Sequence, residues 1–167
     1  MKILITGNLG YVGPWVTRQL RACFPDATLA GIDMGYFAHG LTAAPYLPEA
    51  LLDVQHFADI RHIDDDLLRG VDAIVHLAAI SNDPMGNAYE DVTLDVNHRA
   101  GIALARRAKA AGVRSFVFAS SCSVYGFADD QPRTEASEVA PLTAYARSKV
   151  FTERDLEPLA SRDFRVT

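Results

Sequence analysis

The chain has 167 residues, of which 49% are hydrophobic and 22% charged, a composition that supplies one domain with a hydrophobic core and excludes a disordered chain. The formal net charge of −5 gives no electrostatic attraction to nucleic acid or to an anionic membrane surface, so neither is an expected partner. No apolar run approaches the roughly 18 residues of a membrane-spanning helix. Two cysteines, Cys23 and Cys122, are too few for a disulfide framework, which favours a reduced, cytoplasmic location.

Short apolar segments alternate along the chain with segments of helical periodicity. Strands are predicted at 2–6, at 27–33, within 51–60, at 72–78, at 115–120, and from 164 to the end at 167. Helices are predicted at 12–23, within 63–70, at about 88–111 with Gly112 as its C-terminal cap, and at about 143–160. Residues 34–50 show no periodicity and predict a loop. Apolar strands that alternate with helices predict an α/β, doubly wound parallel sheet, which binds ligands beyond the carboxyl ends of its strands.

The first predicted strand and helix are joined by the glycine-rich stretch TGNLGYVG. Gly7, Gly10 and Gly13 give the spacing G-x-x-G-x-x-G, one residue different from the Rossmann G-x-G-x-x-G. Glycines permit a tight turn and let backbone N–H groups approach a pyrophosphate at the positive end of the helix. The stretch therefore predicts a dinucleotide-binding loop, although such a turn also occurs for purely structural reasons.

Carboxylates follow the second and third predicted strands. Asp33 ends the second strand, where a carboxylate accepts hydrogen bonds from adenosine ribose hydroxyls and repels a 2′-phosphate, so NAD is favoured over NADP. The structural alternative is that Asp33 merely begins a turn. Asp59 is placed to accept from the adenine amino group, with Ile60 against the ring. Together with His56 and His62, Asp59 matches no standard zinc spacing, so no metal is expected.

A tyrosine and a lysine lie four residues apart in Tyr-Ala-Arg-Ser-Lys, residues 145–149. Positions i and i+4 share a helix face, so the spacing fits either an ordinary amphipathic turn or a phenol held beside an ammonium that favours its phenolate. The spacing alone is weak evidence. It gains weight from the glycine turn, the acidic strand end, His-Leu-Ala-Ala (76–79), Asn97 in the long helix, and Ser-Ser-Cys-Ser-Val-Tyr-Gly (120–126).

In this order the features resemble the short-chain dehydrogenase/reductase superfamily, and within it the NAD-dependent epimerase/dehydratase family, which acts on nucleotide sugars. The resemblance covers the whole chain and implies a Rossmann-like sheet, NAD as cofactor and a nucleotide-sugar substrate. It also implies that Tyr145 is the general acid/base, that Lys149 favours its phenolate and binds the nicotinamide ribose, and that Ser121 hydrogen-bonds the reacting hydroxyl.

The same resemblance implies which residues contact each ligand. The cofactor-binding set is Gly7, Gly10, Tyr11, Val12, Gly13, Asp33, Asp59, Ile60, Leu77, Ala78, Ala79, Tyr145 and Lys149. The substrate-binding set is Ser81 and Ser123. Two further roles stay open: His76 is a buried structural histidine or a cofactor contact, and Asn97 is a structural hydrogen-bonder or a member of a proton relay.

The residues after Ser121 bear on the reaction. Sugar 4,6-dehydratases of the family carry Asp-Glu there and the related decarboxylases usually keep a Glu, whereas this chain has Cys122 and Ser123. Neither is a carboxylate acid or base. The resemblance therefore favours a 4-epimerase, which oxidises one carbon and returns the hydride to the other face, with a 4-ketosugar reductase second. A non-catalytic NAD-binding module on the same fold is the alternative from another class.

Three segments depart from the family's usual sequence: Pro14-Trp15, Asn-His-Arg-Ala-Gly at 97–101, and 81–92. They leave the sugar and the nucleotide open. By analogy with the family, helices 88–111 and 143–160 pair with a partner's copies in a homodimer. The sequence ends within the sixth predicted strand. We therefore expect residues 1–167 to be the NAD-binding domain that carries the catalytic residues but lacks most of the substrate-binding part. We expect this form to bind NAD weakly and not to turn over.

Overall fold

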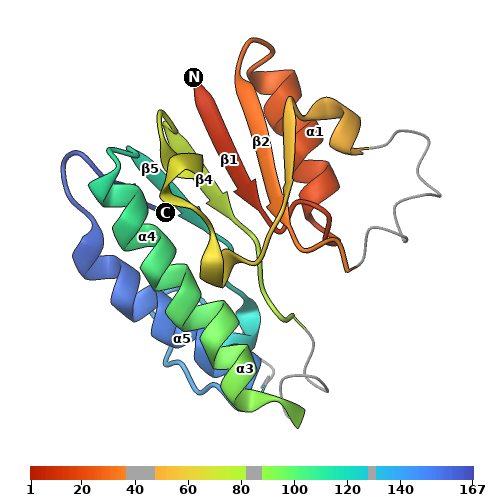
Figure 1. Ribbon diagram of the computed structural model, residues 1–167. Helices are drawn as coiled ribbons and strands as arrows, with labels where there is room; N and C mark the ends of the chain where they lie inside the picture. Colours follow the sequence, from red (N-terminus) through yellow and green to blue (C-terminus); the bar gives the residue numbers. More distant parts are fainter. Residues whose placement is uncertain (37–47, 82–87, 128–130) are drawn as a thin grey trace.

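The computed structural model describes residues 1–36, 48–81, 88–127 and 131–167. These ranges form a six-stranded sheet of order β3-β2-β1-β4-β5-β6 (Figure 1), in which every pairing is parallel. The strands are β1 (Lys2–Thr6), β2 (Thr28–Asp33), β3 (Val54–Phe57), β4 (Ala73–His76), β5 (Ser115–Phe118) and β6 (Arg165–Val166). The strand order reverses between β1 and β4, which is where doubly wound proteins bind their ligands. The predicted fold class is confirmed.

Helices cover both faces of this sheet. They are α1 (Gly13–Cys23), α3 (Glu90–Leu94), α4 (Gly101–Ala110) and α5 (Ala144–Leu156). Figure 1 shows α3, α4 and α5 together on one side of the sheet and α1 on the other. The side chains of β1 agree with this division, because Leu4 packs in the core cluster that includes Leu104 of α4, whereas Ile3 and Ile5 pack in a separate cluster. Successive side chains of a strand point to opposite faces.

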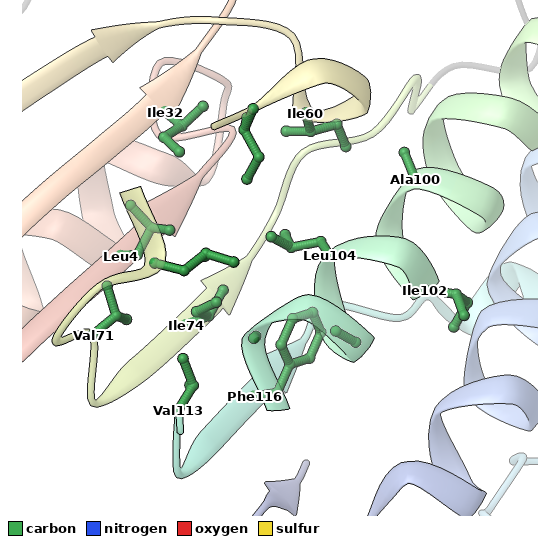
Figure 2. Packing of buried hydrophobic residues seen from close by; sticks show 14 of the residues in the cluster. Leu4, Ile32, Ile60, Val71, Ile74, Ala100, Ile102, Leu104, Val113 and Phe116 are labelled. Carbon is green, nitrogen blue, oxygen red and sulfur yellow. The ribbon is translucent and has the colours of Figure 1, made fainter. Parts of the chain in front are cut away.

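The larger core lies between the sheet and α4 (Figure 2). Ile74 of β4 and Phe116 of β5 are completely buried there and pack with Leu104, and each such side chain contributes about 1.5–3 kcal/mol of burial free energy. Gly101 lets α4 approach β4, because a Cβ at this position would lie 3.0 Å from Nε2 of His76. The core therefore fixes the carboxyl end of β4, the strand after which several predicted site residues follow.

The segment predicted as one continuous helix over 88–111 differs from the prediction. α3 passes into a π-helical segment, Asp95–Ala100, before α4 begins. A π-turn holds one more residue than an α-turn and is often found at functional sites. The predicted helix is therefore present without a break, but its middle is π-helical, because the apolar spacing on either side does not record the extra residue. The predicted end is confirmed, since Gly112 follows α4 with φ of +85°.

Three other predicted segments are refined by the structure. Within 34–50, predicted as a loop, Pro48–Leu51 forms a 3₁₀ helix, and 37–47 lies outside the described residues. The helix predicted within 63–70 is a 3₁₀ turn, Asp65–Leu68. The helix predicted to reach 160 ends as an α-helix at Leu156 and continues as a 3₁₀ turn, Glu157–Leu159. Pro158 in that turn has no N–H to continue the α-helical hydrogen bonds.

Candidate active site

The carboxyl ends of the central strands line up along one edge of the sheet. Thr6 of β1 pairs with Ile32 of β2 and with His76 of β4, and His76 pairs in turn with Phe118 of β5. The residues that follow these strands therefore emerge side by side. They include the glycine turn after β1, Asp33 at the end of β2, and the segments after β4 and β5, as the sequence predicts.

The glycine turn is shaped by close contacts within the protein. Gly7 has φ of +73°, and a Cβ there would lie 2.6 Å from the backbone nitrogen of Ala78. A Cβ on Gly13 would overlap the carbonyl oxygen of Asn8. Gly10 is less confined, because its Cβ would meet only the Gly7 carbonyl oxygen, at 3.3 Å. Packing within the protein therefore requires glycine at positions 7 and 13. The space beside Gly10 is more open, which suits close approach of a ligand to its backbone.

The N-terminus of α1 follows this loop directly and has no side-chain cap. Its N-cap residue, Val12, makes no side-chain capping hydrogen bond, and the first turn contains no acidic residue. Such a helix end carries a partial positive charge and exposed N–H groups, which fits a pyrophosphate. Tyr11 is 95% exposed and Trp15 is 65% exposed, with the Arg18 guanidinium 5.9 Å from the Trp15 ring centroid. Contact between Tyr11 or Val12 and a cofactor stays a prediction.

Asp33 joins β2 to the glycine turn. One carboxylate oxygen accepts from the Leu9 N–H at 3.1 Å, and the other accepts from the Gly35 N–H at 2.8 Å. Asp33 therefore begins a turn, which was the structural alternative to ribose binding. Each carboxylate oxygen can accept more than one hydrogen bond, so the remaining lone pairs are available to ribose hydroxyls. Asp33 thus fits both roles at the end of β2.

Asp59 and Ile60 have well-defined partners within the chain. Asp59 caps a 3₁₀ turn, Ile60–His62, by accepting from the Arg61 N–H at 2.9 Å. Its side chain also forms an ion pair with the Arg61 guanidinium at 2.6 Å. The hydrogen bond from that guanidinium is the largest cause that lowers the pKa of Asp59. Ile60 is buried in the larger core, so adenine recognition by these two residues stays a prediction.

No group of metal-ligating side chains is found within the described ranges of the chain. Within those same ranges, no helix is long and apolar enough to cross a membrane.

Lys149 is buried beside Tyr145 on α5. The helix begins after Thr143, whose hydroxyl accepts from the Ala146 N–H at 3.1 Å. Lys149 is only 4% exposed. Its Nζ donates to the Ala119 carbonyl at 2.7 Å and lies 5.4 Å from the Tyr145 ring centroid. Burial lowers the pKa of Lys149 to about 8, so the ammonium remains charged at neutral pH in a poorly solvated position next to the phenol.

Ser121 lies in the turn against which α5 packs. It caps a 3₁₀ turn, Cys122–Tyr125, and its Oγ accepts from both the N–H and the hydroxyl of Ser123, at 3.3 and 3.0 Å. Two of the three serines predicted to meet substrate, Ser121 and Ser123, are therefore neighbours. Ser81 is exposed after β4, and the adjoining 82–87 of the predicted sugar loop lies outside the described residues. The roles of these serines stay predictions.

His76 has the environment of a structural residue. It is 1% exposed, its Nδ1 lies 2.7 Å from the Thr6 hydroxyl, and its ring lies against Phe116 and Phe118. Burial, followed by the charge of Lys149, lowers the pKa of His76 to about 3. The ring is therefore neutral at physiological pH. Of the two roles left open for His76, the structural one fits these contacts.

Asn97 links three parts of the site. Its side chain accepts from the Ile80 N–H at 2.7 Å and donates to the Ile80 carbonyl at 3.0 Å and to Ser148 Oγ at 3.1 Å. The π-helical segment thereby connects the loop after β4 to the residue preceding Lys149. Sequence reasoning did not identify Ser148 or the Ala119 carbonyl as partners, and no sequence signal could have identified a main-chain oxygen.

The fold, the glycine turn and the Tyr145–Lys149 pair define a nucleotide-binding α/β protein of the Rossmann type. A family model described as the NAD dependent epimerase/dehydratase family matches residues 3–167. The chain therefore belongs to this family, whose members depend on NAD, and the predicted family and cofactor are confirmed.

Individual relatives agree with this assignment. A UDP-glucose 4-epimerase from Rhizobium meliloti (strain 1021) is 29% identical over 159 residues, which cover 93% of this chain and 46% of the relative. The chain thus spans about half the length of the curated relatives it matches. A UDP-glucose 4-epimerase from Stenotrophomonas maltophila with bound NAD and formylated UDP-arabinopyranose is similar in structure, with a TM-score of 0.84 and 26% identity, covering 99% of this chain and 51% of that one.

A dehydratase is similar to a comparable degree. The dTDP-glucose 4,6-dehydratase from Streptomyces venezuelae, solved with NAD and TYD bound, has a TM-score of 0.80 and 30% identity, and the match covers 99% of this chain and 54% of that one. Overall similarity therefore does not separate epimerases from dehydratases for this chain, and the distinction rests on individual residues.

Proposed function

We propose that this chain carries the NAD-binding and catalytic residues of a nucleotide-sugar epimerase that oxidises C4 of the sugar and returns the hydride to the opposite face. The observation that carries the proposal is the buried Lys149 ammonium beside Tyr145, at the sheet edge that also holds the glycine turn and Asp33. Relatives described as UDP-glucose 4-epimerases support the choice of reaction.

The cofactor would lie across the carboxyl edge of the sheet. The backbone N–H groups from Tyr11 to Gly13, at the start of α1, would hold the pyrophosphate, and Asp33 would accept from the adenosine ribose. In this proposal Asp59 and Ile60 lie at the adenine, and Leu77, Ala78 and Ala79 line the loop after β4. NAD supplies the hydride acceptor when bound, and the chain supplies position and charge.

Tyr145 would act as the base in this proposal. A hydride leaves a carbinol carbon only as the hydroxyl proton departs, so a base must contact that oxygen. The Lys149 ammonium stabilises the negative phenolate of Tyr145 because it lies in a site of low dielectric. The Ser121 hydroxyl would donate a hydrogen bond to the same substrate oxygen, and Ser123, bonded to Ser121, would orient it.

The turn after β5 favours an epimerase over a dehydratase. Elimination of water needs an additional acid and base near the sugar, and this turn offers Cys122 and Ser123, neither of which is a carboxylic acid. A 4-ketosugar reductase needs the same three residues as an epimerase and is the second candidate. We further propose a cytoplasmic homodimer in which the surfaces of 88–111 and 143–160 face the partner's copies.

The test separates cofactor binding from chemistry. Calorimetric titration of the 167-residue chain should show weak binding of NAD and weaker binding of NADP. For turnover, the chain is fused after Thr167 to the remaining half of the Rhizobium meliloti relative and assayed for interconversion of UDP-glucose and UDP-galactose. Tyr145→Phe in the fusion should keep NAD binding and lower kcat by about 10²–10⁴-fold.

Three results would count against the proposal. Equal turnover of the Tyr145→Phe fusion would contradict the role of Tyr145. Net reduction of a 4-ketosugar without epimerisation would favour the reductase. NAD binding with no turnover of any nucleotide sugar by the fusion would favour a non-catalytic module.

A further inference from the structure

Two side chains of α5, Lys149 and Glu153, form hydrogen bonds with the residues that follow β5. Lys149 Nζ donates to the Ala119 carbonyl at 2.7 Å, and the hydroxyl of the next residue, Ser120, donates to the Glu153 carboxylate. Lys149 and Glu153 are four residues apart on α5 and so share one face of the helix. Two successive turns of α5 thus hold two successive residues after β5.

The surroundings of Lys149 oppose its charge. The ammonium is 4% exposed and lies 4.7 Å from the Phe118 ring centroid. Desolvation is the largest cause of the lowered pKa of Lys149, and the negative charge of Glu153 acts in the opposite direction and raises it. In the described part of the chain, the other titratable groups recorded beside Lys149 are His76 of β4, which burial keeps neutral, and Tyr145. Neither supplies a permanent negative charge.

Glu153 is held in place instead of moving freely on the surface. Its residue is exposed, but the hydrogen bond from Ser120 fixes one carboxylate oxygen toward the end of β5. Glu153 and Ser120 also line a cavity of about 310 Å³ together with Phe118, the residue whose ring lies under the Lys149 ammonium. A fixed carboxylate near a buried ammonium acts on it continuously, whereas a mobile surface carboxylate is largely screened by solvent.

We propose that Glu153, fixed by Ser120, is a positioning residue that favours the charged form of the Lys149 side chain beside Tyr145. The proposal rests on the proposed function, because the charged ammonium has a catalytic consequence only if Tyr145 is the base. Glu153 need not touch substrate or cofactor, since it acts through Lys149.

The experiment measures the protonation of Lys149 directly. The chain contains three lysines, Lys2, Lys109 and Lys149, so lysine labelled with ¹³C at Cε gives three signals, which Lys2→Arg and Lys109→Arg assign. In the wild-type chain the Lys149 signal should titrate near pH 8, the pKa that burial gives it. Glu153→Gln removes the charge with little change in shape and should lower this midpoint by about 0.5 pH unit or more. Ser120→Ala leaves Glu153 unfixed and should lower it by a smaller amount.

Glu157→Gln is the matched control. Glu157 is an exposed carboxylate one turn farther along that lines the same cavity, so its substitution removes the same charge without breaking the hydrogen bond to Ser120. Its effect on the midpoint should be clearly smaller than that of Glu153→Gln. Equal shifts in the two variants would overturn the proposal.

The sign of the shift separates an electrostatic role from a structural one. If Glu153 only stabilised local packing, its loss would admit water to Lys149, and the midpoint would rise toward the ordinary value for lysine. A rise, or no change, in Glu153→Gln overturns the proposal. If Glu153→Gln does not fold, Ser120→Ala takes its place. A lower Lys149 midpoint in that variant supports the proposal, and a higher or unchanged midpoint overturns it. The titration needs neither NAD nor sugar, so its result is independent of whether the fusion protein shows epimerase activity.

Discussion

Replacement of Lys149 by methionine should stabilise the folded chain at neutral pH, and the gain should fade as the pH rises. Methionine keeps an unbranched apolar side chain but carries no charge. In the wild-type chain, burial lowers the pKa of Lys149 from 10.5 to about 8. Between these two values the unfolded chain binds more protons than the folded chain, so the free energy of unfolding rises with pH. Below pH 8 the folded state carries the full cost of the buried ammonium.

The size of the effect follows from the same values. The difference between 10.5 and about 8 corresponds to about 3 kcal/mol of destabilisation at pH 7, of which about 2 kcal/mol is relieved by pH 9.5. The methionine variant also leaves the Ala119 carbonyl without its 2.7 Å hydrogen bond, which costs about 1 kcal/mol at either pH. We therefore expect a net gain of about 2 kcal/mol at pH 7 and almost none at pH 9.5.

Urea unfolding followed by circular dichroism at the two pH values measures this difference. Lys109→Met is the control, since Lys109 is exposed and also donates to a main-chain carbonyl, that of Leu159 at 2.6 Å. Because the Lys109 charge stays in water, its loss should not give the gain expected for Lys149→Met at pH 7. A Lys149→Met variant that is destabilised equally at both pH values would refute the reasoning that Lys149 is a charged, desolvated group.

Two further predictions concern the parts that hold the site together. Gly13→Ala should cost about 3 kcal/mol because the new Cβ overlaps the Asn8 carbonyl. Gly10→Ala should change stability much less and weaken NAD binding; equal thermal unfolding temperatures for the two variants would contradict this assignment. Asn97→Ala should cost about 2 kcal/mol, since both backbone groups of Ile80 lose their partner. Asn97→Asp keeps the acceptor for the Ile80 N–H and should cost less in the same urea experiment. If the free energy of unfolding of Asn97→Ala lies within about 0.5 kcal/mol of the wild-type value, the hydrogen bonds between Asn97 and Ile80 are not needed for stability.

The parts of the fold that follow from local pattern were predictable. The strand ends at Thr6, Asp33 and His76 lie within two residues of their predicted positions, because buried apolar runs bounded by glycine or polar residues have few alternatives in a parallel sheet. The family followed from the ordered combination of the glycine turn, Ser121 and the Tyr145–Lys149 spacing, although none of these features was specific alone.

The remaining features depend on contacts between distant residues. The burial of Lys149 under Phe118 depends on how α5 packs, which the spacing of two residues on one helix does not encode. The π-helical segment places Asn97 between Ile80 and Ser148, and hydrophobic periodicity contains no record of it. Similarly, all three glycines of the turn were assigned to phosphate binding, whereas Gly7 and Gly13 are also needed for close packing against Ala78 and Asn8.

The exposed indole on the first turn of α1 is an intrinsic fluorescence probe of this helix end. Trp15 is the single tryptophan in the sequence and lies two residues beyond the last glycine of the turn. Its emission therefore reports on the helix end that would face a pyrophosphate, where the Arg18 guanidinium lies 5.9 Å from the ring centroid. Because the ring is largely in water even in the folded chain, global unfolding should change its emission little. A fluorescence response to added dinucleotide can thus be attributed to this one turn.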